Sequence, residues 1–233
     1  MKQALAIAAK DLRSEIRGKE IAPAMLFFGA TLILLLSFSL PPGSGRAPVP
    51  IPVAGAVAAR HVAGTLLWTS ILFAALIGLG SSAAIEHQGS RIEGLIMAPV
   101  DPALIFIGKA AANFVFLTLL EAVMLPVFVI LLDPAPGLFP GILLVLLMAN
   151  IGLSSVGTLF GTAAQFSTSK SLVLPLLIFP SCVPILLSAS QLTSGLMMSG
   201  TFEGQSRWTI LMLAFDIVYV TLGAVTFEFV LTE

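Results

Sequence analysis

Two carboxylic acids interrupt long apolar stretches of this sequence and are the first candidates for chemistry. Glu121 lies in the middle of one apolar run, and Asp216 lies in another run near the end of the chain. An ionisable side chain at the centre of a bilayer costs about 2.5–3.5 kcal/mol on insertion scales. Each acid should therefore face a protein interior or a wet cavity, and Asn150 is a candidate polar neighbour from a third run.

Two interpretations of Glu121 remain open from the sequence. As a functional residue, it would belong to a substrate pathway or a gate. As a structural residue, it would be a neutral, protonated acid that holds two helices together. Pro126 follows five residues later and removes a backbone hydrogen bond, which favours a kink in the same helix.

A polar segment between two apolar runs, residues 86–101, is the second candidate. Ile92, Leu95 and Ile96 have helical spacing, which predicts a short helix parallel to the membrane. A transporter driven by a separate ATPase needs such an element to receive the mechanical stroke. The alternative is a helix that merely caps two spans. The residues of this candidate ATPase-coupling loop are Glu86, Arg91, Glu93, Gly94, Pro99 and Asp101.

The N-terminal segment, residues 1–20, has the pattern of an amphipathic helix that lies in the membrane interface. The apolar positions that share one helical face are Leu5, Ala9, Leu12 and Ile16. The basic residues on its flank are Lys10, Arg13 and Arg17. That flank can meet anionic lipid head groups. A simple topology anchor fits the same residues, and so does contact with a cytoplasmic partner.

The usual signatures of an enzyme are absent from the sequence. No Gly-x-x-x-x-Gly-Lys-[Ser/Thr] phosphate loop occurs, because Gly108-Lys109 lacks the required earlier glycine. The two histidines, His61 and His87, are predicted on opposite sides of the membrane and form no Ser/His/Asp set. The single cysteine, Cys182, excludes an internal disulfide and a covalent haem-attachment motif. We therefore predict no catalytic residue, no metal site and no ATP site on this chain.

The elements that must position the polar candidates are membrane-spanning helices. The 233-residue chain is 58% hydrophobic and only 10% charged, whereas a soluble domain carries roughly 25% charged residues. Its net charge of −1 provides no basic field for nucleic acid. We predict an all-α integral membrane protein that forms a single permease domain over residues 1–233.

Runs of about 20 apolar residues predict six transmembrane helices. They cover residues 21–40, 62–85, 103–132, 138–164, 172–191 and 208–231. Eight of the 11 Lys and Arg residues fall on the side of the N-terminus, which predicts both termini in the cytoplasm of a bacterial inner membrane. The predicted outer loops, including residues 41–60 and 192–207, are too short for a catalytic domain.

The region from Trp68 to Leu132 resembles the cytochrome c maturation protein B (CcmB) family, the membrane subunits of haem-exporter ABC systems. The motifs that carry the resemblance are Glu93-Gly94-Leu95, Ala98-Pro99, Gly108-Lys109, Asn113, and Glu121 with Pro126. The N-terminal segment from Ala9 to Glu15 is also similar to the start of the family. The chain departs from the family at Gly89–Glu93, which is one residue longer than the usual turn, and at Pro102, where a basic residue is common.

This resemblance implies a six-helix permease of the ABC-2 exporter type. Two copies of the chain would pair with two copies of a separate ATPase subunit that binds ATP. Haem would be a substrate, and the partners would include haem-handling membrane proteins and a haem chaperone. The coupling loop would receive the stroke of the ATPase. Whether haem itself crosses the bilayer, or a haem-loaded chaperone is released, stays open.

Three other functions fit the same residues. The chain could be a six-span exporter of another lipophilic substrate, such as a lipid or a drug. It could be a proton-coupled secondary transporter that uses Glu121 and Asp216. It could also be a scaffold that organises an assembly complex without moving a substrate.

Overall fold

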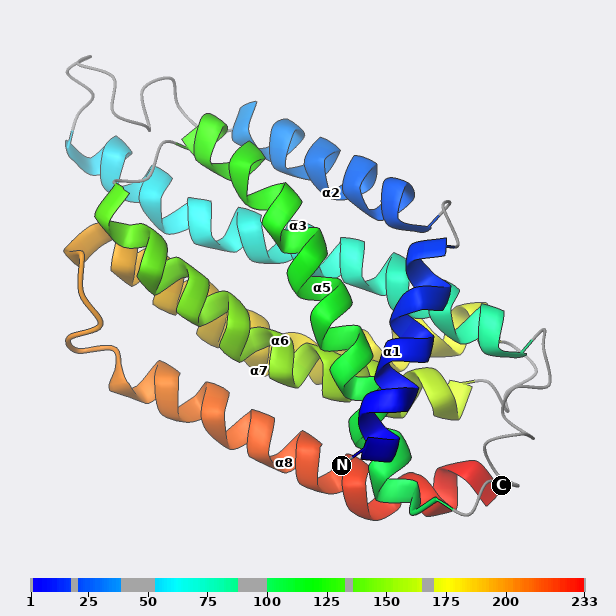
Figure 1. The fold of residues 1–233 in the computed structure, drawn as a ribbon. Helices are drawn as coiled ribbons and strands as arrows, with labels where there is room; N and C mark the ends of the chain where they lie inside the picture. Colours follow the sequence, from blue (N-terminus) through cyan, green and yellow to red (C-terminus); the bar gives the residue numbers. More distant parts are fainter. Residues whose placement is uncertain are drawn as a thin grey trace.

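The computed structural model describes residues 2–17, 21–38, 53–87, 100–132, 136–164 and 170–232. Every regular element within these ranges is a helix. The long helices form a bundle, and the first helix lies across one end of it (Figure 1). The helices are α1 (Lys2–Arg17), α2 (Ile21–Phe38), α3 (Val53–His87), α5 (Pro102–Leu132), the short 3₁₀ helix η1 (Pro136–Leu138), α6 (Phe139–Ala163), α7 (Lys170–Ser199) and α8 (Ser206–Thr232).

Five of the described helices are long and apolar enough to cross a bilayer. Helices α3 and α5 to α8 contain apolar stretches of 18 to 29 residues. At 1.5 Å per residue, the shortest of these approaches the thickness of a hydrocarbon core, which is about 30 Å. The apolar part of α2, Ala22–Leu35, is shorter. The chain is therefore a multi-pass membrane protein, and the sixth span remains a prediction.

Helix α1 packs against α5 near Ala4 and Ile7. Ala4 is buried, and an added Cβ at Gly108 of α5 would lie 2.9 Å from the carbonyl oxygen of Ala4 and 3.1 Å from the Ile7 side chain. The predicted apolar face of α1 is divided, because Leu5 is 68% exposed and Ala9 is also exposed, whereas Leu12 packs against the core. Part of the predicted apolar face therefore remains outside the bundle.

The start of α5 is defined by Asp101 and Pro102. The Asp101 carboxylate accepts a hydrogen bond from the backbone N–H of Ala103 at 2.8 Å, which makes Asp101 an N-cap. Pro102 occupies the first helical position, where its missing N–H has no intrahelical partner to lose. The predicted start at residue 103 is thus correct to one residue.

Helices α3 and α7 are longer than the spans predicted for them. Helix α3 begins at Val53, because the Ala-rich stretch before Arg60 has high helix propensity, although its apolar stretch begins at Val62 as predicted. Helix α7 continues to Ser199 rather than ending at residue 191. Thr193 in this extension is buried and accepts a hydrogen bond from Trp68 of α3.

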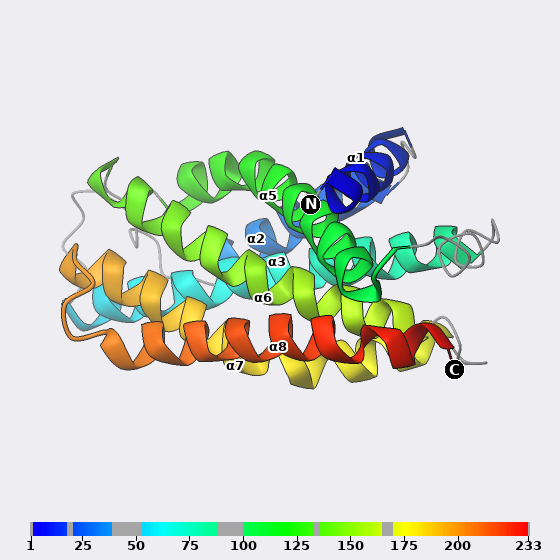
Figure 2. The same ribbon diagram turned by 60° about the horizontal axis from the view of Figure 1, so that its bottom comes forward.

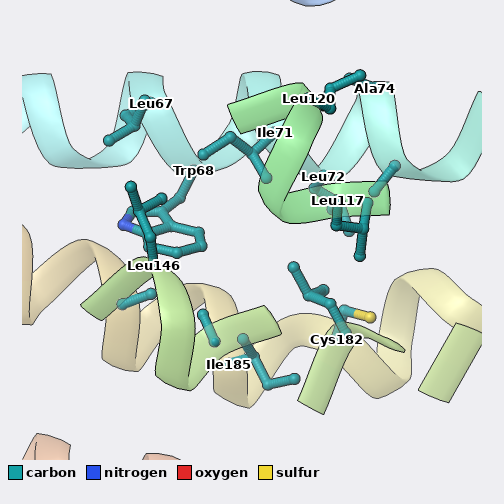
Figure 3. Close-up of a cluster of buried hydrophobic side chains, with 14 of the residues drawn as sticks. Leu67, Trp68, Ile71, Leu72, Ala74, Leu117, Leu120, Leu146, Cys182 and Ile185 are labelled. Carbon is teal, nitrogen blue, oxygen red and sulfur yellow. The ribbon is translucent and has the colours of Figure 1, made fainter. Parts of the chain in front are cut away.

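The core of the bundle joins six of the described helices, because Met25 and Ile33 of α2 and Met212 of α8 belong to the same buried cluster as residues of α3, α5, α6 and α7. Figure 3 shows side chains of α3 pointing toward residues of α5, α6 and α7. The labelled side chains are Leu67, Trp68, Ile71, Leu72, Ala74, Leu117, Leu120, Leu146, Cys182 and Ile185. Cys182 is fully buried and free, so it acts as a small apolar core residue.

Helix α8 presents a largely apolar outer face. Its exposed side chains include Ile210, Ile217, Val225 and Phe229. Such a face is costly in water and suits contact with lipid tails. The end of α8 and helix α1 lie at the same end of the bundle in both ribbon views (Figures 1 and 2).

Replacing Gly108 by Ala tests the packing of α1 on α5. The new Cβ would contact the α1 backbone at Ala4, and overpacking of this kind costs about 1–3 kcal/mol. We expect α1 to be held less tightly, which would speed tryptic cleavage after Lys10 and Arg13 in solubilised protein. Gly137→Ala is the control, because nothing lies within 4 Å of its added Cβ. Equal cleavage of the Gly108 variant and the parent protein would contradict this contact.

Candidate functional site

A hydrogen-bonded pair of polar side chains links α5 to α6 inside the bundle. Glu121 is 3% exposed and Asn150 is fully buried. The Asn150 side-chain Nδ2 donates a hydrogen bond to Glu121 Oε2 at 2.6 Å. The same nitrogen lies 3.2 Å from the hydroxyl of Thr118, one helical turn before Glu121. Asn150 is therefore the polar neighbour of Glu121 that the sequence suggested as a candidate.

A second side-chain amide joins the same two helices, and here the donor lies on α5 and the acceptor on α6. Asn113 of α5 donates from Nδ2 to the hydroxyl of Thr158 in α6 at 2.9 Å. The Thr158 hydroxyl in turn donates to the carbonyl oxygen of Ser154. Asn113 lies eight residues before Glu121, which is about 12 Å along the helix. Two separated side-chain contacts therefore fix both the register and the rotation of α5 against α6.

The link at Glu121 is incomplete in its hydrogen bonding. Glu121 Oε1 and Asn150 Oδ1 are buried and have no hydrogen-bond partner in the described structure. A buried polar atom without a partner typically costs about 1–3 kcal/mol. The two unpaired atoms are both acceptors and belong to the two residues that already share a hydrogen bond.

Asp216 occupies a separate position between α8 and α6. It is 4% exposed, and both of its carboxylate oxygens lack hydrogen-bond partners. Gly152 of α6 provides the space, because an added Cβ there would lie 2.5 Å from Asp216 Oδ1 and 2.4 Å from Ile185 of α7. Asp216 therefore packs at a point where α6, α7 and α8 meet.

The structure does not bring Glu121 and Asp216 together as one pair. Their contact points on α6, Asn150 and Gly152, are two residues apart and so lie about 200° apart around the helix. Both acids are nevertheless at a similar depth, because each lies about 15 Å along its helix from the same end of the bundle. The two carboxyl groups flank α6 on different sides.

A polar contact between α3 and α7 was not identified from the sequence. The indole N–H of Trp68 donates to the Thr193 hydroxyl at 3.0 Å, and the hydroxyls of Thr65 and Ser190 lie 2.8 Å apart. At Gly64 the helices come so close that a Cβ would lie 2.7 Å from the Ser190 carbonyl oxygen. Small and hydroxyl residues at helical spacing are a known signal for helix pairing in membranes. That signal was present in 190–194, but it crosses the predicted end of the fifth span at residue 191 and continues into the predicted outer loop.

A cavity of about 320 Å³ lies between α5, α6 and α8. Its lining is apolar except for the hydroxyls of Ser154 and Ser155, and both of these donate to the carbonyl oxygen of Ile151. The remaining lining residues are Phe106, Ile107, Ala110, Ala111, Phe114, Ile151 and Val220. This lining offers no His, Cys or carboxylate ligand to a metal ion.

Most of the candidate coupling loop lies outside the described residues, and this applies to Arg91, Glu93, Gly94 and Pro99. Glu86 belongs to the last turn of α3. Asp101 is exposed and caps α5. The loop therefore connects the end of α3 to the capped start of α5, and its role in coupling stays a prediction.

Two basic residues of α1 lie on its free side. Lys10 and Arg13 are exposed, and the Lys10 ammonium is 3.4 Å from the Asp11 carboxylate. An exposed pair of this kind contributes little to stability. Arg17 is the last residue of α1. The contact of these residues with lipid head groups stays a prediction.

Gly152→Ala tests the packing of Asp216 against α6. The added methyl group would collide with Asp216 and Ile185, so we expect a loss of about 1–3 kcal/mol, seen as a lower melting temperature in detergent. Gly161→Ala on the same helix is the control, because its nearest new contact is Leu174 at 4.0 Å. That substitution should leave the melting temperature equal or higher, since Ala favours helix. Equal melting of both variants would contradict the close packing at Gly152.

Comparisons with known proteins place these helices in a family. Residues 2–232 match the family of the CcmB protein. Heme exporter protein B of Rhodobacter capsulatus is 29% identical over 189 residues, which is 80% of each chain, and that of Paracoccus denitrificans gives the same values. Heme exporter protein B of Pseudomonas aeruginosa is 28% identical over 125 residues, or 54% of this chain and 56% of its own. The family match spans nearly the whole chain, so this protein belongs to the CcmB family.

Proposed function

We propose that this chain is the membrane (permease) subunit of an ATP-driven complex that exports or handles haem for c-type cytochrome assembly. The observation that carries the proposal is the family match over residues 2–232. The relatives that share 28–29% identity bear the name Heme exporter protein B. Haem is then a transient substrate of the chain and not a resident cofactor.

ATP hydrolysis belongs to a separate ABC ATPase subunit in this proposal. The sequence has no phosphate-binding loop of its own. The end of α3, the start of α5 and helix α1 lie at the same end of the bundle (Figures 1 and 2). The coupling loop, residues 86–101, connects two of these elements. A partner at this end of the bundle would contact both the loop and the basic side of α1.

The geometry of α5 supports a way to transmit a push from that loop. Asp101 caps the helix at the end of the loop. Gly108 packs against α1, and Glu121 accepts a hydrogen bond from Asn150 of α6. A displacement of the coupling loop would therefore reach α1 and α6 through their contacts with α5.

The remaining features of the proposal concern topology and partners. Helix α2 would be the sixth span, with both termini in the cytoplasm and the chain in a bacterial inner membrane. A second copy of the chain, haem-handling membrane proteins and a haem chaperone would complete the complex. The exposed stripe at Leu5 and the basic residue Lys10 support a position of α1 in the membrane interface.

The alternative functions have less support. A proton relay through Glu121 and Asp216 would need the two acids to exchange protons, yet both Asp216 oxygens lack a hydrogen-bond partner and α6 separates the residues. An exporter for another lipophilic substrate would have the same fold. A non-transporting scaffold differs in one respect: an ATPase-dead partner would still support cytochrome maturation.

Glu93→Ala in the coupling loop tests the proposed contact with the ATPase. Loss of one interfacial charge pair of about 1.4 kcal/mol would weaken binding about tenfold, so less ATPase should co-purify with the variant. Glu203→Ala is the control, because Glu203 is an exposed acid between α7 and α8, at the other end of the bundle. Undiminished ATPase binding and stimulation in the Glu93 variant would show that this loop is not the coupling element.

The neighbourhood of the gene gives an independent check. A gene for a small ABC ATPase and genes for haem-handling membrane proteins should lie beside it. If the chain instead drives uptake or export that follows a proton gradient in vesicles and ignores ATP, the proposed class of transporter is wrong.

A further inference from the structure

Two unpaired acceptors that belong to one hydrogen-bonded pair of side chains in the α5–α6 contact imply a missing hydrogen. Asn150 Nδ2 already donates to Glu121 Oε2 at 2.6 Å. The remaining oxygen of each side chain, Glu121 Oε1 and Asn150 Oδ1, is buried without a partner. An amide oxygen can only accept a hydrogen bond, and so can an ionised carboxylate. The four polar atoms are thus one donor short.

We propose that Glu121 binds a proton on Oε1 and donates it to Asn150 Oδ1. The acid and the amide then form a cyclic pair, in which each side chain donates one hydrogen bond and accepts one. A single proton satisfies both unpaired atoms and removes the charge. Glu121 is in this sense a proton-binding site that holds α5 against α6.

Among the side chains that the structure describes, no cation lies near Glu121 to balance an ionised carboxylate. Helices α2 and α6 contain no charged residue, and the described side chains of α3 (62–79) and α7 (174–199) contain none. On α5 itself, Lys109 lies twelve residues away, which is about 18 Å along the helix. A charge left alone in such surroundings is strongly disfavoured.

The charged residues of the other helices that pack near α5 lie away from Glu121. Helix α1 carries Lys10, Asp11 and Arg13, but it crosses α5 at Gly108, about 20 Å along the helix from Glu121. Helix α8 carries Arg207, Asp216 and Glu228, and Asp216 is packed on another side of α6 at Gly152. None of these groups shares a hydrogen bond with Glu121.

Two substitutions of Glu121 distinguish this proposal from a role that requires the negative charge. The proposal predicts that Glu121→Gln is more stable than Glu121→Asp, whereas a role for the charge predicts the reverse. Glu121→Gln keeps the length of the side chain and supplies an N–H donor for Asn150 Oδ1, so the cyclic pair persists as two amides. Glu121→Asp keeps an acid but shortens the side chain and breaks the pair. We expect the Gln variant to melt within a degree or two of the parent protein in detergent, and the Asp variant to melt clearly lower.

Infrared spectroscopy of the purified protein detects the proton directly. A protonated carboxylic acid has a C=O stretching band apart from those of carboxylates and amides. We expect this band at neutral pH in the parent protein, its loss in Glu121→Gln, and a shift in Asn150→Ala, which removes the partner of the acid. Asp216→Asn is the control that assigns the band to Glu121. The acid band that disappears in Glu121→Gln should remain in Asp216→Asn, because Asp216 is the second buried acid.

Either of two results would overturn the proposal. The first is loss of a carboxylate band, rather than an acid band, in Glu121→Gln. The second is a Gln variant that fails to accumulate while the Asp variant accumulates normally, since that order shows that an acid group, and not the amide-like pairing, is required. Neither readout depends on haem or on the ATPase, so failure of the proposed function leaves this test intact.

Discussion

The side-chain amides of Asn113 and Asn150 provide the contact on which the rest of the bundle depends. Lipid tails are as apolar as leucine, so burial of apolar surface does not bring membrane helices together as it does in water. Close packing and interhelical hydrogen bonds must do so instead. Helix α5 holds α1 at Gly108 and begins directly after the candidate coupling loop, so its pairing with α6 sets the position of α1 and of the helix start.

Small residues determine where the helices can approach each other. Gly64 brings α3 against the α7 backbone, and Gly152 leaves room for Asp216 beneath α8. At each of these points a methyl group would collide with its neighbour. The helices therefore cross closely at a few points, and polar contacts lie near those points. Such contacts favour motion of whole helices over a uniform deformation of the bundle.

Hydropathy predicted the helices well because the requirement on a membrane span is simple. The start of α5, the span of α6 and the buried state of Glu121 follow from length and polarity alone. The extension of α7 could not be predicted in this way, since polar residues interrupt the apolar run and the partner of Thr193, Trp68, lies on another helix. The packed face of α1 was also hidden, because its contact with Gly108 at Ala4 and Ile7 does not coincide with the apolar face that the pattern indicated.

Reconstitution tests most directly whether this membrane chain works as half of an ATP-driven haem machine. A candidate ABC ATPase partner would be assembled in lipid nanodiscs with and without the chain, and ATP hydrolysis would be measured with and without haem. The proposed function predicts that the chain binds the ATPase and that hydrolysis responds to haem only when the chain is present. Hydrolysis that is identical in empty nanodiscs and indifferent to haem would contradict it.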